Sequence, residues 1–298
     1  MSAALPARAT GAPVDTLDAL DALDALDALL TAQAASGAFP SRVTVGDRRY
    51  TDENAFVTAL VLDALSRLPA GMADRAIARG LDFIESCASA TCPGAFHFYP
   101  PGRMPSWLGA DLPADADDTA LALTLLVHFG RRTAAQAFDA LDRALHPWRL
   151  HYRPESVDPW VAQGACRTWL DRRAAPNPVD ACVNANVATA LTAFGGAGHA
   201  ACRAARDTVL DAIAFVAANP AHRARLTAFY PDLWELVHAL RRGARHGVAG
   251  FAHAAAQLAG MLAPHAGAQA TVFSSTDLRW LWTAPLLQTA RTLTRGTP

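Results

Sequence analysis

The sequence predicts an all-α protein built from two layers of helices. Apolar residues recur at helical spacing in almost every segment, and Ala and Leu dominate the 298 residues. β-Branched residues are sparse, so we expect no strand. Helices that are apolar along their whole length alternate with amphipathic, Ala- and Arg-rich ones. Because the first kind must be buried and the second can cover it, the alternation predicts a single-domain α/α toroid of five to six helical hairpins.

The elements follow from this alternation. Amphipathic outer helices are expected over 15–32, 73–88, 133–145, 199–218 and 246–263. Each inner helix is expected to open with an acidic residue, at Asp52, Asp115, Asp180, Asp232 and Asp277. The Pro/Gly-rich segment 92–114 is expected to form a long loop at the mouth of a central cavity, and Val157–Arg173 part of a sixth hairpin. Residues 1–14 are expected to be a flexible N-terminus and 15–298 the domain.

Charge and composition exclude several functions. The 26 basic residues are all Arg and balance 27 acids, so no basic face is large enough for nucleic acid. Polar residues interrupt every apolar run short of a membrane span, which leaves only peripheral membrane contact open. The N-terminus lacks the apolar core of a secretory signal, and the five Cys show no zinc spacing. We therefore predict a cytoplasmic protein with reduced thiols.

The densest functional signal is an acidic cluster at the start of one inner helix. Asp115, Asp117 and Asp118 precede a wholly apolar run. Carboxylates this close cannot all ionise cheaply, so one should stay protonated near neutral pH, as a general acid requires. Helix capping is the alternative, because Asp is favoured at the N-cap and in the first turn. Capping explains two of the acids better than the third.

The six residues from Asp115 to Ala120, DADDTA, resemble the DxDD(T/S)A motif of class II terpene cyclases, a group that includes squalene-hopene cyclases and copalyl diphosphate synthases. The stretch from Gln33 to Phe39 is similar to the QW element of that family, with Phe39 in the aromatic place. The resemblance implies an α/α toroid and protonation-initiated cyclisation of a linear isoprenoid. Asp117 would be the proton donor, tuned by Asp115 and Asp118.

The resemblance also bears on partners and cofactors. Class II cyclases usually carry two toroids with the site between them, whereas this chain has length for one. Either a homodimer or the toroid's own cavity would then complete the site. No redox cofactor is implied, and Mg²⁺ is implied only if the substrate is a diphosphate. His97, His151 and His238 are the candidates for a hydrogen-bond partner of Asp117.

Carbocation chemistry needs a dry cavity lined by aromatic faces, because their negative quadrupoles stabilise cations. The candidate substrate-binding residues combine aromatics near the expected mouth with one polar residue; core packing is the alternative for each aromatic. They are Trp107, Trp160, Asn184, Tyr230, Trp234, Phe273, Trp280 and Trp282, with Phe229 beside them. Asn184 and Asn186 would serve either a structural network or ligand contacts.

Other charged residues favour structural roles. Asp180 and Cys182 invite comparison with the zinc site of protein prenyltransferase β subunits, but no matching His follows, so no metal site is expected. Glu235 and His238 are expected to form a surface ion pair. The arginines that follow on the same helix, Arg241, Arg242 and Arg245, are expected to serve its C-terminus, or the phosphates of a diphosphate substrate.

Two other functions remain open from the sequence. The chain could be a non-catalytic toroid that binds a lipid or a partner protein, with the aspartates acting as caps. It could also act on a glycan, with the acids at the cavity mouth as paired carboxylates. A deep, dry, aromatic pocket favours the cyclase, a filled centre favours the binding module, and a wide wet groove favours glycan chemistry.

Overall fold

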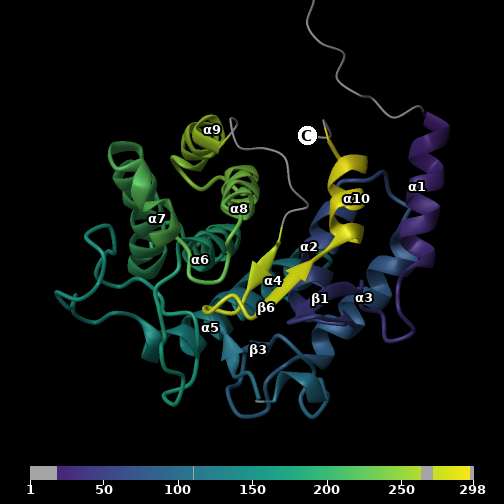
Figure 1. Cartoon of the computed structure of the whole chain (residues 1–298), viewed down its shortest axis with the longest axis horizontal. Helices are drawn as coiled ribbons and strands as arrows, with labels where there is room; N and C mark the ends of the chain where they lie inside the picture. The colour runs from purple at the N-terminus through teal and green to yellow at the C-terminus, as the bar shows by residue number, and fades with distance from the viewer. Residues whose placement is uncertain (1–18, 110, 263–270, 296–298) are drawn as a thin grey trace, which may run out of the picture.

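The computed structural model describes residues 19–109, 111–262 and 271–295, and within these it contains ten α-helices (Figure 1). The expected N-terminal segment 1–14 lies outside the described residues. Five helices form an outer set: α1 (Ala19–Thr31), α3 (Asp74–Ser86), α5 (Ala134–Leu145), α7 (Ala200–Ala218) and α9 (Phe251–Leu262). Five form an inner set: α2 (Ala55–Leu65), α4 (Ala116–His128), α6 (Ala181–Ala193), α8 (Trp234–Arg245) and α10 (Pro285–Leu293).

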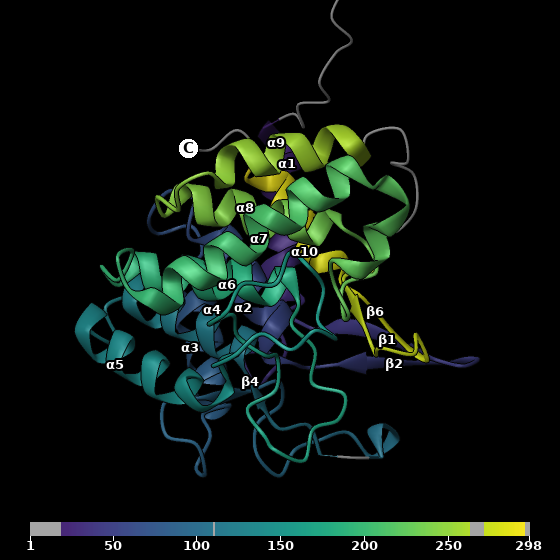
Figure 2. The same cartoon turned by 90° about the vertical axis from the view of Figure 1, so that its left-hand side faces the viewer.

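The two sets pack as two layers. The inner helices are neighbours in the order α10, α2, α4, α6 and α8, and α1, α3, α5, α7 and α9 pack against them (Figures 1 and 2). Every described residue from Ala116 to Leu126 in α4 is buried, as is every one from Ala181 to Leu191 in α6. The outer helices α3 and α5 bury one face each. The alternation of apolar and amphipathic segments is therefore confirmed for the inner helices α2, α4 and α6, whereas the inner helices α8 and α10 carry polar and charged residues along their length.

A glycine recurs between outer and inner helices because the chain approaches the next outer helix closely there. Gly37, Gly94 and Gly164 all have φ between +93° and +96°. A Cβ on Gly37 would lie 2.2 Å from the Arg79 carbonyl oxygen, and one on Gly94 would lie 2.9 Å from the Ala140 Cβ. Only glycine fits such a site without strain. The sequence Gly-Ala-Phe occurs at 37–39 and again at 94–96, and Gly164-Ala165-Cys166 is its counterpart in a third unit of the fold.

Each of the three segments that begin with Gly37, Gly94 and Gly164 is hydrogen-bonded to the inner helix that follows it, and the pattern is the same in all three. Asn54, Asp115 and Asp180 are the N-caps of α2, α4 and α6, and each accepts a backbone N–H of its own first turn. Four residues later, a polar side chain accepts the N–H of the third residue in the glycine repeat. The bonds are Phe39 N to Thr58 Oγ1 at 3.1 Å, Phe96 N to Thr119 Oγ1 at 2.9 Å, and Cys166 N to Asn184 Oδ1 at 2.9 Å. Asn184 is therefore a structural bridge.

The QW-like element joins two outer helices. The Gln33 amide donates to the carbonyl oxygens of Gly37 and Ala76, both at 2.8 Å, and so links the end of α1 to α3. Phe39, in the aromatic place of the element, is fully buried. These contacts hold the first unit of the repeat against the second.

The expectation of no strand is wrong. A four-stranded antiparallel sheet has the order β2-β1-β6-β5, and β3 pairs with β4 in a second sheet. The bounds are β1 Ser41–Val45, β2 Arg48–Asp52, β3 Phe96–His97, β4 Ala114–Asp115, β5 Phe273–Ser274 and β6 Trp280–Thr283. Val43 on β1 lies between Tyr50 and Trp282, so these three side chains share the buried face. β2, β4 and β6 each lead into the N-terminal end of an inner helix.

Two further expectations need correction. Asp277 does not open a helix: it lies in the turn between β5 and β6, and the inner helix begins at Pro285. Val157–Arg173 contains no helix and supplies no sixth hairpin. In the described residues of 92–114, which leave out residue 110, the segment is a loop as expected, interrupted by β3, the start of β4 and a short 3₁₀ turn over Ser106–Leu108. Among the described helices, none is both long and apolar enough to cross a bilayer.

α8 packs closely against α6 and α9 at Gly243. A Cβ there would lie 2.5 Å from the Phe251 ring of α9 and 2.7 Å from the Thr189 hydroxyl of α6. We expect Gly243→Ala to lower the free energy of unfolding by about 1–3 kcal/mol, because overpacking forces neighbours to move. Gly260→Ala is the matched control: that helical position has open space, so Ala should add up to about 1 kcal/mol. Urea titration of both variants measures the difference, and equal effects would contradict close packing at Gly243.

Candidate active site

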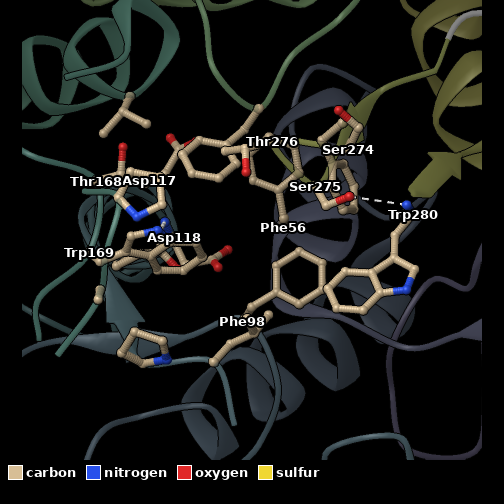
Figure 3. A pocket seen from close by; sticks show the side chains of 18 of the residues that line it. Phe56, Phe98, Asp117, Asp118, Thr168, Trp169, Ser274, Ser275, Thr276 and Trp280 are labelled. Atoms are coloured by element: carbon tan, nitrogen blue, oxygen red, sulfur yellow. Dashed lines mark hydrogen bonds between the residues drawn. The ribbon is translucent and has the colours of Figure 1, made fainter. Parts of the chain in front are cut away.

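A cavity of about 380 Å³ lies where the N-terminal ends of the inner helices meet the four-stranded sheet. Side chains from α2, α4, α6, both sheets and the loops before α6 and α8 line it. The aromatic members are Phe56, Phe98, Trp169, Phe229, Tyr230, Phe273, Trp280 and Trp282. Figure 3 shows Asp117, Asp118, Thr168 and Trp169 on one side, Ser274, Ser275 and Trp280 on the opposite side, and Phe56 and Phe98 between them. The cavity is thus largely apolar with a carboxyl cluster at one side.

Asp117 has a hydrogen-bond donor on each carboxyl oxygen. The Asn186 amide of α6 donates to Oδ1, and the Tyr230 hydroxyl, from the loop before α8, donates to Oδ2. Asp117 itself is 4 % exposed and lines the cavity. Burial raises the pKa of Asp117, while Tyr230, Asn186 and the charge of Arg242 oppose that rise. Burial therefore favours the neutral form of Asp117, while the hydrogen bonds from Asn186 and Tyr230 stabilise its anion.

Asp115 and Asp118 share the same buried environment. Asp115 caps α4 by accepting the Asp118 N–H at 2.7 Å. Burial raises the pKa of Asp115 to about 7, and burial together with the nearby charge of Asp115 raises the pKa of Asp118 well above its ordinary value. Asp118 Oδ1 is buried without a hydrogen-bond partner. Burial in an apolar site therefore raises the pKa of all three carboxyl groups, which favours their neutral forms.

The repeat distinguishes capping from function. Asp115 corresponds to the caps Asn54 and Asp180, so its cap role is confirmed. Asp117 lies two residues after its cap, and the equivalent residues of the other two units are Phe56 and Cys182. Asp118 lies three residues after its cap, and the equivalent residues are Val57 and Val183. The fold uses apolar residues at these positions, so capping does not account for Asp117 or Asp118.

Another buried carboxyl, outside the cluster on α4, holds aromatic side chains of the cavity wall in place. Asp52, at the end of β2, accepts hydrogen bonds from the Trp282 indole N–H and the Tyr99 hydroxyl, both at 2.9 Å. It also accepts from the Asn54 amide at 2.7 Å. Trp282 is held face to face with Phe273, their ring centroids 4.8 Å apart. The network fixes the orientation of two rings that line the cavity.

The structure brings only some of the predicted site residues to the cavity. The three aspartates line it, together with Tyr230, Phe273, Trp280 and Trp282. Four residues are absent from the described lining. Trp107 stacks on Tyr50 instead, with centroids 5.5 Å apart, and Trp160 is buried in the core. Trp234 begins α8, with its N–H bound by Asp232 at 2.9 Å, and Asn184 binds backbone. Nearness to an inner-helix start did not determine which aromatic faces inward.

None of the three histidine candidates contacts Asp117. His97 faces the Leu112 carbonyl oxygen, and His151 is exposed beside His146. His238 lies on α8, where burial lowers its pKa to about 3. The partners are Asn186 and Tyr230 instead. The repeat could have indicated Asn186, because the same position, six residues after the cap, holds Leu60 and Leu121 in the other units.

Two charged residues of α8 are buried: Glu235, which was expected in a surface ion pair, and Arg242, which was expected at the helix C-terminus. Glu235 forms a bidentate ion pair with Arg291 of α10, with both N–O distances 2.7 Å, and does not serve as a surface partner of His238. Arg242 donates to Asn186 Oδ1 at 2.5 Å. Arg245 binds Asp63 at 3.0 Å near the surface. The helical spacing placed these residues on α8 but did not reveal that two of them face the core.

Asp180 and Cys182 form no metal site with their neighbours. Asp180 is saturated by backbone N–H groups of Cys182, Ala228 and Phe229. In the part of the chain that the structure describes, no three His, Cys, Asp or Glu side chains are placed to hold a metal ion.

The fold is that of type II terpene cyclases. The type II terpene cyclase MstE from Scytonema superposes with a TM-score of 0.52 and 17% identity, over 92% of this chain and 72% of MstE. A variant of MstE holding its substrate geranylgeranyl dihydroxybenzoate gives the same TM-score and identity, over 92% of this chain and 71% of MstE. A protein from Actinoplanes superposes with a TM-score of 0.52 and 20% identity, over 93% of this chain and 74% of its own. No protein-family model matches the sequence, and no curated protein matches it significantly.

Proposed function

We propose that the chain is a class II-type terpene cyclase in which Asp117 protonates a linear isoprenoid. The observation that carries this proposal is the position of Asp117: a buried carboxyl with a donor on each oxygen, in an aromatic cavity, at a place where the other repeat units have apolar residues. We also infer that the two helix layers form an α/α toroid, closed between α8 and α10 by Glu235 and Arg291.

The proposed step is a proton transfer from the Asp117 carboxyl to a terminal alkene carbon. The π electrons of the alkene form the new C–H bond, and the adjacent tertiary carbon becomes the cation. The next alkene attacks that carbon, and loss of a proton ends the cascade, so the product is an isomer of the substrate. Hydrogen bonds from Asn186 and Tyr230 strengthen as Asp117 becomes an anion, which stabilises the transition state more than the ground state.

The cavity walls suit the cationic intermediates. Aromatic faces attract a passing cation, and an apolar lining offers few polar groups to hold a water molecule that would quench it. The apolar, aromatic lining favours the cyclase over a glycan enzyme, which needs a wet groove, and the presence of a cavity favours it over a binding module with a filled centre. A volume of about 380 Å³ lies near the lower end of the roughly 300–1,000 Å³ typical of ligand sites, which favours farnesyl or geranylgeranyl chains over squalene.

Isotope labelling tests the proposal. The protein is incubated in D₂O with farnesyl and geranylgeranyl alcohols, their diphosphates, prenylated phenols and squalene, and products are analysed by mass spectrometry. We expect a cyclised isomer that carries a single deuterium from the exchanged Asp117 carboxyl. Release of inorganic diphosphate without deuterium uptake would mean that the reaction begins by ionisation of a diphosphate and not by protonation. If no substrate were converted, the alternative of a non-catalytic binding module would be favoured.

A further inference from the structure

A buried polar chain runs behind Asp117 through three inner helices. Asn186 of α6 donates through Nδ2 to Asp117 of α4, and its Oδ1 accepts from Arg242 Nη2 of α8 at 2.5 Å. Asn186 is 2 % exposed and Arg242 is 4 % exposed. Charged and polar groups this deep are costly unless each satisfies the next, so the chain is a specific feature of this core.

Arg242 determines which way the Asn186 amide points. An amide can present either its N–H₂ or its oxygen to a neighbour, but a guanidinium only donates. Oδ1 must therefore face Arg242, which leaves Nδ2 facing Asp117. In the flipped orientation, two donors would meet at Arg242 and two acceptors at an ionised Asp117. Without Arg242, only an ionised Asp117 would oppose the flip, because a protonated Asp117 can itself donate to the amide oxygen.

Arg242 is itself held from the far side. Its Nη1 lies 3.9 Å from Asp63 Oδ2 of α2, and Arg245 binds the same carboxylate at 3.0 Å. Arg67 and His246 also face Asp63. The titratable groups that face Asp117 are Asp115 and Asp118 on α4, Asp180 and Cys182 at the start of α6, and Tyr230. Arg242 therefore supplies positive charge to a cluster otherwise composed of acids and neutral groups.

We propose that Arg242 is a positioning residue that acts on Asp117 through Asn186, holding the amide so that an N–H donor stays on the acid throughout the catalytic cycle. The inference rests on the proposed role of Asp117 as the acid. Once Asp117 has lost its proton, the carboxylate gains most from this donor, because hydrogen bonds to charged groups are the stronger ones. Arg242 thereby makes Asp117 a stronger acid than burial alone would allow.

Infrared difference spectroscopy tests the inference without turnover. The C=O stretch of protonated Asp117, assigned by its loss in Asp117→Asn, is followed against pH. Arg242→Met keeps the length of the side chain and removes donor and charge. We expect the pKa of Asp117 to rise by at least about one unit, a tenfold weaker acid. Because a general acid works while protonated, the alkaline limb of the kcat profile should move to higher pH as kcat falls.

Three further variants keep the test decisive. Asn186→Leu restores the residue type of the equivalent positions, so it should fold, and it should shift the pKa of Asp117 in the same direction. Arg242→Lys should shift it less, because a charged donor remains. Arg245→Met, which alters the same Asp63 but does not contact Asn186, should leave it unchanged. An unchanged pKa of Asp117 in Asn186→Leu or Arg242→Met would overturn the inference, whereas absence of any cyclisation would refute only the proposed function.

Discussion

Asp117→Asn is expected to lower kcat for any isoprenoid the protein cyclises by about 10³-fold or more, since general acid catalysis typically contributes 10²–10⁴-fold and the reaction here cannot begin without the proton. The substitution removes little else. Asn keeps the size of the side chain, its oxygen can still accept from Asn186, and its amide can donate to Tyr230. The fold and the cavity should therefore be preserved, and the substrate should still bind.

Single-turnover mass spectrometry measures the rate, and quenching of the cavity tryptophans by the substrate measures binding. Asp115→Asn separates the two interpretations of the acidic cluster, because Asn is about as good an N-cap as Asp. If the aspartates served only as caps and structural acids, both variants would bind substrate and show wild-type turnover. Retention of turnover by Asp117→Asn within about tenfold of the wild type would remove Asp117 from the chemistry.

The helices could be predicted because each carries its own pattern. The apolar runs of α2, α4 and α6 and the amphipathic α3 and α5 are properties of consecutive residues. The strands were missed because they are two to five residues long and their pattern is weak. The alternation of Ser41, Val43 and Val45 with Arg42 and Thr44 around a turn at Gly46 indicates a hairpin, but a short hairpin is stable only when other elements cover it.

The sequence could predict the acidic residues of the site but not the residues that contact them. The three aspartates follow from their density, whereas the partners of Asp117 come from α6 and from the loop before α8. Sequence distance says nothing about such contacts. Asn184 and Asn186 look alike in sequence, yet Asn184 binds backbone and Asn186 binds the acid. The fold repeat separates them, because Asn184 has counterparts in Thr58 and Thr119 and Asn186 has none.

Glu235→Gln is expected to lower the free energy of unfolding by about 3–5 kcal/mol, the usual effect of removing one partner from a buried ion pair. Gln has the shape of Glu but no charge, so Arg291, whose side chain is 11 % exposed, would keep a buried cation without a counter-charge. The loss should be largest between α8 and α10, the two inner helices that this pair joins. Amide hydrogen exchange should accordingly speed up most in α10.

Glu85→Gln is the matched control, because Glu85 pairs with Arg131 at the surface and exposed pairs contribute about 0–1 kcal/mol. The pH dependence gives a second readout. Arg291 holds the pKa of Glu235 below its ordinary value despite burial, so the pair stabilises the fold above the unfolded pKa of Glu and loses this effect as pH falls through the folded pKa. Wild type and Glu235→Gln should therefore converge in stability in acid. Equal losses for Glu235→Gln and Glu85→Gln at neutral pH would mean that packing of α10 against α1 and α2, and not the ion pair, keeps the helix in place.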